Sequence, residues 1–221
     1  MHKMYGRVQG FRDRAFIAIC TVLLFGWTAS ARAVTLTNGF LSVSNGMLFA
    51  TQEYSNGNFS ISYNVSQIGT QITYTYTLFV PQKNLSHWNL GLSTNFTSSD
   101  LISFSSSIPT DLVGPQVWSP DQGSSQEGMP DDLFGYKFQP TSGTRTGLVT
   151  FTIVTDRLPT NGNFYARDGG GVYVYNTGFA NPSTGAFLIV PDSVAVVPEP
   201  SSLVLAIGGV LMMMLATRRR R

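Results

Sequence analysis

The sequence predicts an all-β ectodomain, an antiparallel β-sandwich or jelly roll, between two terminal sorting segments. Apolar and polar residues alternate with a period of two in several stretches, which is typical of strands with one buried face. Gly, Ser, Thr, Asn and Pro recur at intervals of about ten residues, as do the turns of a sandwich. Because no long 3.6-residue period occurs between residues 34 and 190, the predicted helices are an N-terminal signal helix and a C-terminal transmembrane helix.

The first 33 residues have the three parts of a secretory signal peptide. A basic start precedes an apolar run, 15–27, and a small-x-small signal peptidase site follows at Ala31 and Ala33. We therefore expect the mature chain to begin at Val34. The basic start contains no adjacent arginines, which favours general secretion of the unfolded chain over twin-arginine export.

The ectodomain is expected to span residues 34–190, and three of its stretches alternate most clearly: 59–65, 72–80 and 149–154. Each carries β-branched, aromatic or other apolar residues at every second position and mostly Ser, Thr or Asn between them. These stretches are predicted to be half-buried strands. The sequence predicts a last strand at 187–190, followed by a linker over 191–200 that holds the motif Pro198, Glu199 and Pro200.

Two glycine-containing turns predict hairpins. The dipeptide Asn45-Gly46 tolerates the positive φ of a two-residue type I′ turn, so strands 40–44 and 47–51 are expected to pair. The run from Asp168 to Gly171 predicts a longer hairpin connection. In contrast, the stretch 98–135 is rich in Ser, Pro, Gly and Asp, which favours long loops with two edge strands.

Charge and cysteine content exclude several classes of function. The whole chain has a formal charge of +2, but residues 34–197 hold five basic and ten acidic residues, a formal charge of −5. Nucleic acid is therefore not an expected partner, since binding it needs a clustered basic face. The one cysteine, Cys20, lies in the signal peptide, so the mature domain has no disulfide, cysteine-bound zinc or thiol nucleophile.

The C-terminus combines three features in a fixed order. Pro198, Glu199 and Pro200 precede a predicted transmembrane helix over 201–217, and the tail Arg218, Arg219, Arg220 and Arg221 ends the chain. Prolines interrupt regular structure, so the triplet is expected to be extended and accessible. The arginines resist translocation, which leaves the tail in the cytoplasm and the ectodomain outside.

These residues resemble the PEP-CTERM sorting signal of Gram-negative bacteria, and the resemblance covers residues 197–221. It implies that an exosortase, a membrane-embedded cysteine transpeptidase-like enzyme, cuts near the Pro-Glu-Pro triplet and releases or transfers the ectodomain. The chain would be the substrate of that reaction. Parts of the ectodomain also resemble an anchored β-sandwich type found among bacterial exported proteins, which implies surface attachment and assigns no catalytic residue; they are 73–77, 85–90, 151–156 and 164–169.

Catalytic chemistry has little support in the sequence. His87 is the one histidine of the mature chain and the one ordinary candidate for a general base, and no Gly-x-Ser-x-Gly nucleophile motif accompanies it. Beside Trp88 at a predicted strand start, it is expected to be a packed structural residue. No catalytic residue, enzyme activity or cofactor is therefore predicted.

Four carboxylates lie within twelve residues of a Gly- and Pro-rich stretch: Asp121, Glu127, Asp131 and Asp132. Such a collection can surround Ca²⁺ with oxygen ligands, although the spacing is not that of an EF-hand. A solvated acidic loop is the simpler interpretation. No metal site is therefore predicted, and these four residues are kept as a candidate Ca²⁺ site.

Aromatic residues raise a hypothesis of polysaccharide binding, since a flat ring packs against the C–H face of a sugar. Most aromatic residues are expected in the core, because strands favour them by propensity. The candidates for an exposed platform are Trp88, Trp118, Tyr136, Tyr165, Tyr173 and Tyr175.

Together these features predict an exported, non-enzymatic protein of a Gram-negative bacterium. It would be held in the inner membrane before processing by signal peptidase and an exosortase-type enzyme, and then displayed at the cell surface or in the extracellular matrix. The alternative is a carbohydrate-binding or Ca²⁺-dependent adhesive module, and a hydrolase is least favoured. The expected partners are the membrane, the two processing enzymes and, for the alternative, a polysaccharide.

Overall fold

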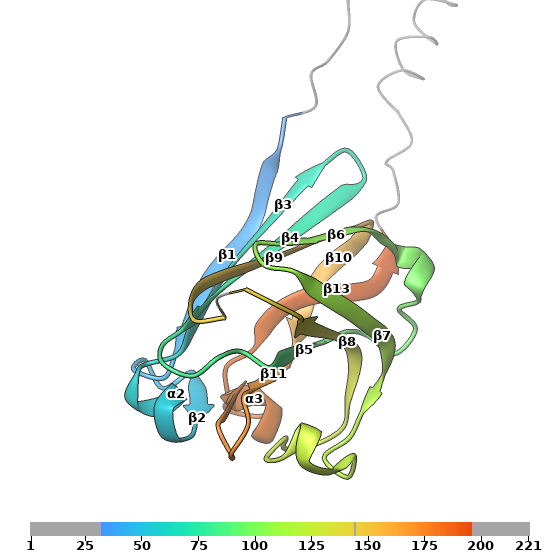
Figure 1. The fold of residues 1–221 in the computed structure, drawn as a ribbon. Helices are drawn as coiled ribbons and strands as arrows, with labels where there is room; N and C mark the ends of the chain where they lie inside the picture. The colour runs from blue at the N-terminus through green and yellow to red at the C-terminus, as the bar shows by residue number, and fades with distance from the viewer. Residues whose placement is uncertain (1–31, 144, 196–221) are drawn as a thin grey trace, which may run out of the picture. The chain divides into compact units, whose positions relative to one another are not determined.

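The computed structural model describes residues 32–143 and 145–195 (Figure 1). Most of the predicted signal peptide, the Pro-Glu-Pro motif, the predicted transmembrane helix 201–217 and the arginine tail 218–221 lie outside the described residues. Among the residues that are described, no helix has the length and apolar character needed to span a membrane. The described strands all belong to one compact unit that begins at Ala33.

The described domain is all-β, as predicted, and all its strand pairs are antiparallel. A five-stranded sheet has the order β1 (Val34–Ser42), β3 (Ser60–Ile68), β4 (Gln71–Val80), β9 (Gly147–Thr155) and β6 (Leu101–Ser106). A six-stranded sheet has the order β2 (Leu48–Ala50), β12 (Tyr173–Asn176), β11 (Phe164–Arg167), β5 (His87–Gly91), β8 (Leu133–Pro140) and β7 (Thr110–Trp118). A third, two-stranded sheet pairs β10 (Arg157–Gly162) with β13 (Leu188–Ala195).

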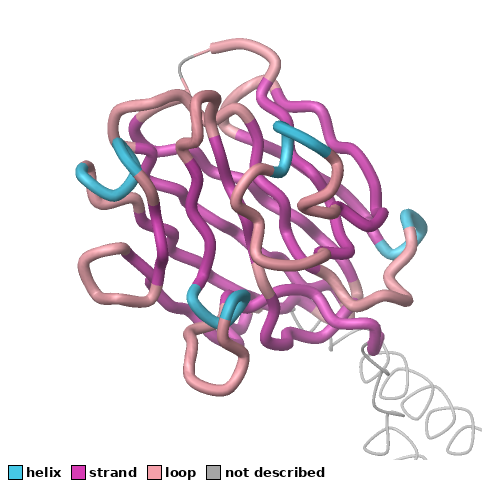
Figure 2. The backbone as a smooth tube through the Cα atoms, turned by 90° about the horizontal axis from the view of Figure 1, so that it is seen from below, coloured by secondary structure: helices cyan, strands magenta, loops and turns pink. Residues whose placement is uncertain are grey.

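Short helical segments lie in the connections between strands (Figure 2). In the described part of the chain these segments are α2 (Gln52–Asn56), α3 (Thr177–Ala180) and the 3₁₀ turns η1 (Ser98–Asp100) and η2 (Gly123–Gln126). None is longer than five residues, so strand packing supplies the core.

The hydrophobic core lies between the five-stranded and six-stranded sheets. Trp88 of β5 stacks on Phe138 of β8, with ring centroids 4.5 Å apart, and packs across the sandwich against Phe151 of β9 at 5.1 Å. Two buried tyrosines of β4 satisfy their hydroxyls on the two-stranded sheet: Tyr74 donates to the Arg157 carbonyl at 2.7 Å and Tyr76 to the Ile189 carbonyl at 2.9 Å. These bonds tie the small sheet to the core.

Several predicted elements are confirmed. The three alternating stretches form β3, β4 and β9, and in β4 every second side chain from Ile72 to Val80 is buried. The glycine run Asp168–Gly171 joins β11 to β12, closed by the Asp168 N–H on the Val172 carbonyl at 2.8 Å. The stretch 98–135 contributes β6 and β7, which are the edge strands of the two large sheets.

The predicted hairpin at Asn45-Gly46 is wrong, because β1 pairs with β3 and β2 pairs with β12, so the chain changes sheets there. A type I′ turn needs positive φ at both central residues. Gly46 has φ 73°, whereas Asn45 is not among the described residues with positive φ. The Asn45 side chain instead accepts the backbone N–H groups of Ser42 at 3.0 Å and Met47 at 3.1 Å, which stabilises a turn between the sheets.

The predicted end of the ectodomain at residue 190 is also corrected. Strand β13 continues to Ala195, so residues 191–195 belong to a sheet and not to the linker. Pro191 lies opposite Pro159 of β10. Prolines are tolerated here because each strand of a two-stranded sheet has a free edge that needs no N–H donor.

Candidate functional site

An open groove of ≈ 310 Å³ lies where several strands end. Its walls are the end of β5 and the following turn, residues 91–94, the beginning of β8, residues 132–134, and the passage from β10 to β11, residues 160–163. Val190 of β13 completes the lining. A cavity of this size lies at the lower end of the roughly 300–1,000 Å³ range of small-molecule sites.

Backbone and side-chain hydrogen bonds hold the walls in place. The Gly91 N–H donates to the Asn163 carbonyl at 2.7 Å, and the Leu92 N–H donates to the Phe134 carbonyl at 2.8 Å. The Ser93 hydroxyl donates to the Asp192 carboxylate at 2.6 Å, which attaches the turn after β5 to β13. The groove is therefore preformed from segments that are distant in sequence.

The polar lining of the groove is neutral except for one carboxylate. Asp132 and Asn161 are exposed and Thr160 is half-buried, so their polar groups are accessible to a ligand. Apolar surface comes from the half-buried Phe134 and from Val190. No lysine, arginine or histidine is among the described residues that line the groove.

Beside the groove, the segment Ser119–Asp132, here called the covering loop, packs on the outer face of the six-stranded sheet. Met129 of this loop belongs to a second apolar cluster with Trp118, Leu133, Tyr165 and Phe179. The Tyr165 hydroxyl donates to the Glu127 carbonyl, which attaches the loop to β11. Gly128 lies against the Tyr173 ring so closely that an added Cβ would be 2.1 Å from a ring carbon.

Polar side chains are buried beneath the covering loop. Asn89 donates from Nδ2 to Gln126 Oε1 at 3.1 Å, and both residues are fully buried. Arg167 is also buried, with its Nη2 3.8 Å from the Glu127 carboxylate. Burial, together with the positive charges of Lys137 and Arg167, lowers the pKa of His87 to about 3, although hydrogen bonds to Gln126 and the Ser125 backbone act in the opposite direction.

His87 begins β5 and is 4% exposed, as expected of a packed residue at a strand start. Its low pKa leaves the imidazole neutral at pH 7, and the covering loop separates it from solvent. His87 is not among the described residues that line the groove, and an imidazole with so low a pKa is a weak base.

The structure does not gather the four carboxylates of the candidate calcium site. Among the described residues, no group of three or more His, Cys, Asp or Glu side chains could hold a metal ion. Glu127 faces Arg167, and Asp131 accepts the backbone N–H of Asp132 at 2.8 Å. Asp132 lines the groove, whereas Asp121 is exposed on the first part of the covering loop.

The predicted aromatic platform is present only in part. Four of the six candidates are buried, namely Trp88, Trp118, Tyr136 and Tyr165, and the half-buried ones are Tyr173 and Tyr175. Phe49, which the sequence did not single out, is 44% exposed and stacks on Tyr175 with centroids 4.9 Å apart and planes at 21°. This distance is typical of rings that face each other, so the two rings cover each other's faces.

The residues of the groove were missed by sequence reasoning, with the exception of Asp132. The end of β5, the beginning of β8 and the end of β10 meet at the groove. This arrangement brings together Thr160, Asn161 and Phe134, which belong to no sequence motif. A Thr-Asn-Gly-Asn sequence after a strand is a turn signal, and turn signals near strand ends were the one available indication.

The described residues thus define an all-β sandwich domain with a preformed, mostly neutral groove. No protein-family model matches the chain, and no curated protein matches it. Among solved structures, the chain is similar to the KRT10-binding region domain of the pneumococcal serine rich repeat protein PsrP, with 14% identity over 73% of this chain and 99% of that chain and a TM-score of 0.29. A likeness at that TM-score carries no argument.

Proposed function

We propose that this chain is an exported, non-enzymatic β-sandwich protein that an exosortase-type system processes for display at the cell surface or in the extracellular matrix. The observation that carries the proposal is the order of Pro198–Pro200, the apolar segment and the arginine tail at the C-terminus. The signal-peptide pattern at the other end supports the same route.

Features of the domain are compatible with export. Among the described residues, its apolar core is built from side chains between Leu41 and Val190. The mature part contains no cysteine, so folding after secretion needs no disulfide formation. The last strand ends at Ala195, shortly before Pro198, which leaves the motif adjacent to the domain.

A non-catalytic role agrees with the distribution of titratable groups. Of the described residues that line the groove, Asp132 is the one with a titratable side chain in the neutral or acid range. General acid and base catalysis by carboxylates needs a pair, about 5–10 Å apart in glycosidases. His87 is buried and is not among the described residues that line the groove, so it does not supply the missing partner.

The sorting proposal is tested by mass spectrometry of the chain from a Gram-negative host that has an exosortase-type system. The expected product begins at Val34 and lacks Arg218–Arg221. Glu199→Ala should give a longer product that stays in the membrane fraction with the arginine tail attached. Ser202→Ala, just outside the triplet, is the matched control and should be processed like the parent chain.

Processing that is the same in the Glu199→Ala variant and the parent would exclude recognition of the triplet. A product that retains Met1 would exclude the signal peptide. Both measurements use the full-length chain, as the parent or as a single-residue variant, and neither depends on a ligand of the domain.

A further inference from the structure

The groove has a lining suited to one class of ligand. We propose that it binds a neutral sugar ring, and that Asp132, Asn161 and Thr160 hold the sugar hydroxyls. This inference goes beyond the sorting function and does not depend on it, because the groove is formed entirely by the ectodomain.

The first argument is shape. The groove volume of ≈ 310 Å³ suits a ligand of the size of a mono- or disaccharide. Its walls are fixed by the bonds from Gly91 to Asn163 and from Leu92 to Phe134, so little ordering is needed when a ligand enters. Preformed sites lose less conformational entropy on binding, which favours affinity for a small ligand.

The second argument is the set of polar groups. A sugar hydroxyl both donates and accepts hydrogen bonds, so its ideal partners are a carboxylate, an amide and a hydroxyl. Asp132 supplies two acceptor oxygens, Asn161 supplies a donor and an acceptor, and Thr160 supplies a hydroxyl. The half-buried Phe134 ring offers apolar surface to the C–H groups of the sugar.

The third argument is charge. The lining holds one carboxylate and no cationic side chain, and the mature part of the chain has a formal charge of −5. Polysaccharides of uronic acids and phosphate-bearing ligands would be repelled by Asp132. A neutral sugar avoids this repulsion, and its hydroxyls gain a charge-assisted hydrogen bond to the carboxylate.

The test uses the full chain in a detergent without a sugar headgroup, because glycoside detergents would compete for the groove. A glycan array with neutral, anionic and amino-sugar oligosaccharides identifies a ligand, and calorimetry gives the Kd of the best neutral binder. Asp132→Asn should weaken binding about tenfold, because a hydrogen bond to a charged acceptor is replaced by one to a neutral acceptor. Asn161→Ala should weaken it about fivefold through the loss of one neutral hydrogen bond.

Asp131→Asn is the matched control, since it makes the same change of charge at the neighbouring residue. Asp131 is exposed and does not line the groove, and the new amide keeps the oxygen that accepts the Asp132 N–H. We expect its Kd to equal that of the parent. The Kd of a neutral monosaccharide is then compared with the Kd of its oligosaccharide. This comparison distinguishes a free sugar from a polysaccharide as the ligand.

Three results would overturn the proposal: an array without binding to any neutral glycan, unchanged affinity in both groove variants, or equal weakening by Asp131→Asn and Asp132→Asn. Thermal melting of each variant checks folding, and the exposed Asn161 provides a second variant if Asp132→Asn is unstable. Sorting and sugar binding are separable, because Glu199→Ala should keep the parent affinity and Asp132→Asn should be processed like the parent.

Discussion

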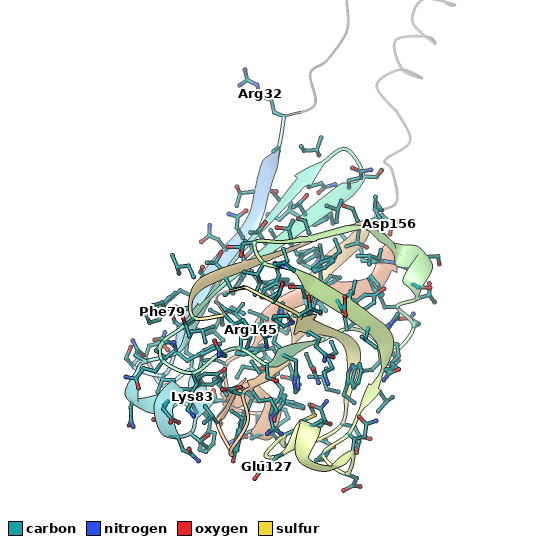
Figure 3. The ribbon with its side chains drawn as sticks, viewed as in Figure 1. Arg32, Phe79, Lys83, Glu127, Arg145 and Asp156 are labelled. Carbon is teal, nitrogen blue, oxygen red and sulfur yellow. The ribbon has the colours of Figure 1, made fainter. Side chains whose placement is uncertain are left out.

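The outer faces of the two large sheets differ in how they meet solvent. On the five-stranded sheet, hydroxyl and amide side chains stand in register, with Asn64 opposite Thr75 and Thr75 opposite Thr152, and all three are half-buried or exposed. On the six-stranded sheet, the covering loop covers the middle of the corresponding face, and all five residues of β5 are buried. Figure 3 shows side chains of the domain as sticks and labels Glu127, which lies on the covering loop.

The difference shows that polar side chains on a strand do not by themselves indicate a solvent-exposed face. Thr73, Thr75 and Thr77 are half-buried and alternate with buried residues, because their side of β4 is only partly covered. His87 and Asn89 also point away from the sandwich core, yet they are buried because the covering loop supplies contacts, among them the bond from Asn89 to Gln126. Buried polar groups need such partners to remain stable.

The largest expected effect that separates the two faces comes from Tyr165→Ala. This change removes a fully buried ring and the hydroxyl that bonds to the covering loop, so it should lower the free energy of unfolding by about 3–5 kcal/mol. Thr75→Ala on the other outer face should cost less than about 1 kcal/mol. Urea unfolding of the purified protein measures both, and equal losses would remove the distinction between the faces.

The difference between the two outer faces also explains which strands the sequence predicts. The sequence predicts strands β3, β4 and β9 because one face of each is only partly buried, so apolar and polar residues alternate along the strand. The sequence of β5 alternates as well, with Trp88 and Leu90 between polar residues, but its burial does not alternate, since both of its faces are covered. The turn at Asn45-Gly46 could not be distinguished from a hairpin, because its local sequence is the same whether the next strand pairs with β1 or with the other sheet.

The groove was less predictable than the strands. Its residues Asp132, Thr160 and Asn161 come from the covering loop and from β10, which are distant in sequence and meet only when the two-stranded sheet docks on the core. Local propensity contains no information about that docking. His87, which lies outside the groove, was easier to predict. Its place beside Trp88 at a predicted strand start indicated a packed residue, and it is buried in the structure.

The second-largest expected effect is a dependence of stability on pH, which arises because His87 is buried beneath the covering loop. The pKa of His87 is lowered to about 3 in the folded chain by burial and by the charges of Lys137 and Arg167. Below its ordinary value of about 6.5 the unfolded chain binds a proton that the folded chain does not, so stability is lost as the pH falls below about 6.5.

The expected loss is about 1.4 kcal/mol per pH unit, and a comparison of pH 7 with pH 5 avoids most carboxylate titration. Urea unfolding at the two pH values should show this loss in the parent and a smaller one in His87→Asn. The comparison is made within each variant, so any change in overall stability does not affect it. The same pH dependence in the variant and the parent would show that His87 is accessible to protons.

A smaller effect is expected from Asn89→Ala. The change leaves Gln126 Oε1 without its buried donor, which should lower the free energy of unfolding by about 1–3 kcal/mol. Asn64→Ala is the matched control, because Asn64 is exposed on the outer face of the five-stranded sheet, and it should change stability by less than about 0.5 kcal/mol. An equal cost at both positions would show that the covering loop does not exclude water from Asn89.

The smallest expected effect concerns calcium at the covering loop. Among the described residues its carboxylates form no group that could hold a metal ion, and contacts such as those of Tyr165, Gln126 and Met129 already attach the loop to the sheet. A Ca²⁺ ion bound only to the folded state would add about 2.7 kcal/mol at a hundredfold excess over its Kd. Because about 1 kcal/mol moves the midpoint of a domain of this size by roughly 2–4 °C, a bound ion would be visible in a melt. We expect melts in millimolar Ca²⁺ and in chelator to coincide, and a shift that Asp131→Asn abolishes would show instead that a cation, and not these side-chain contacts alone, holds the covering loop on its face.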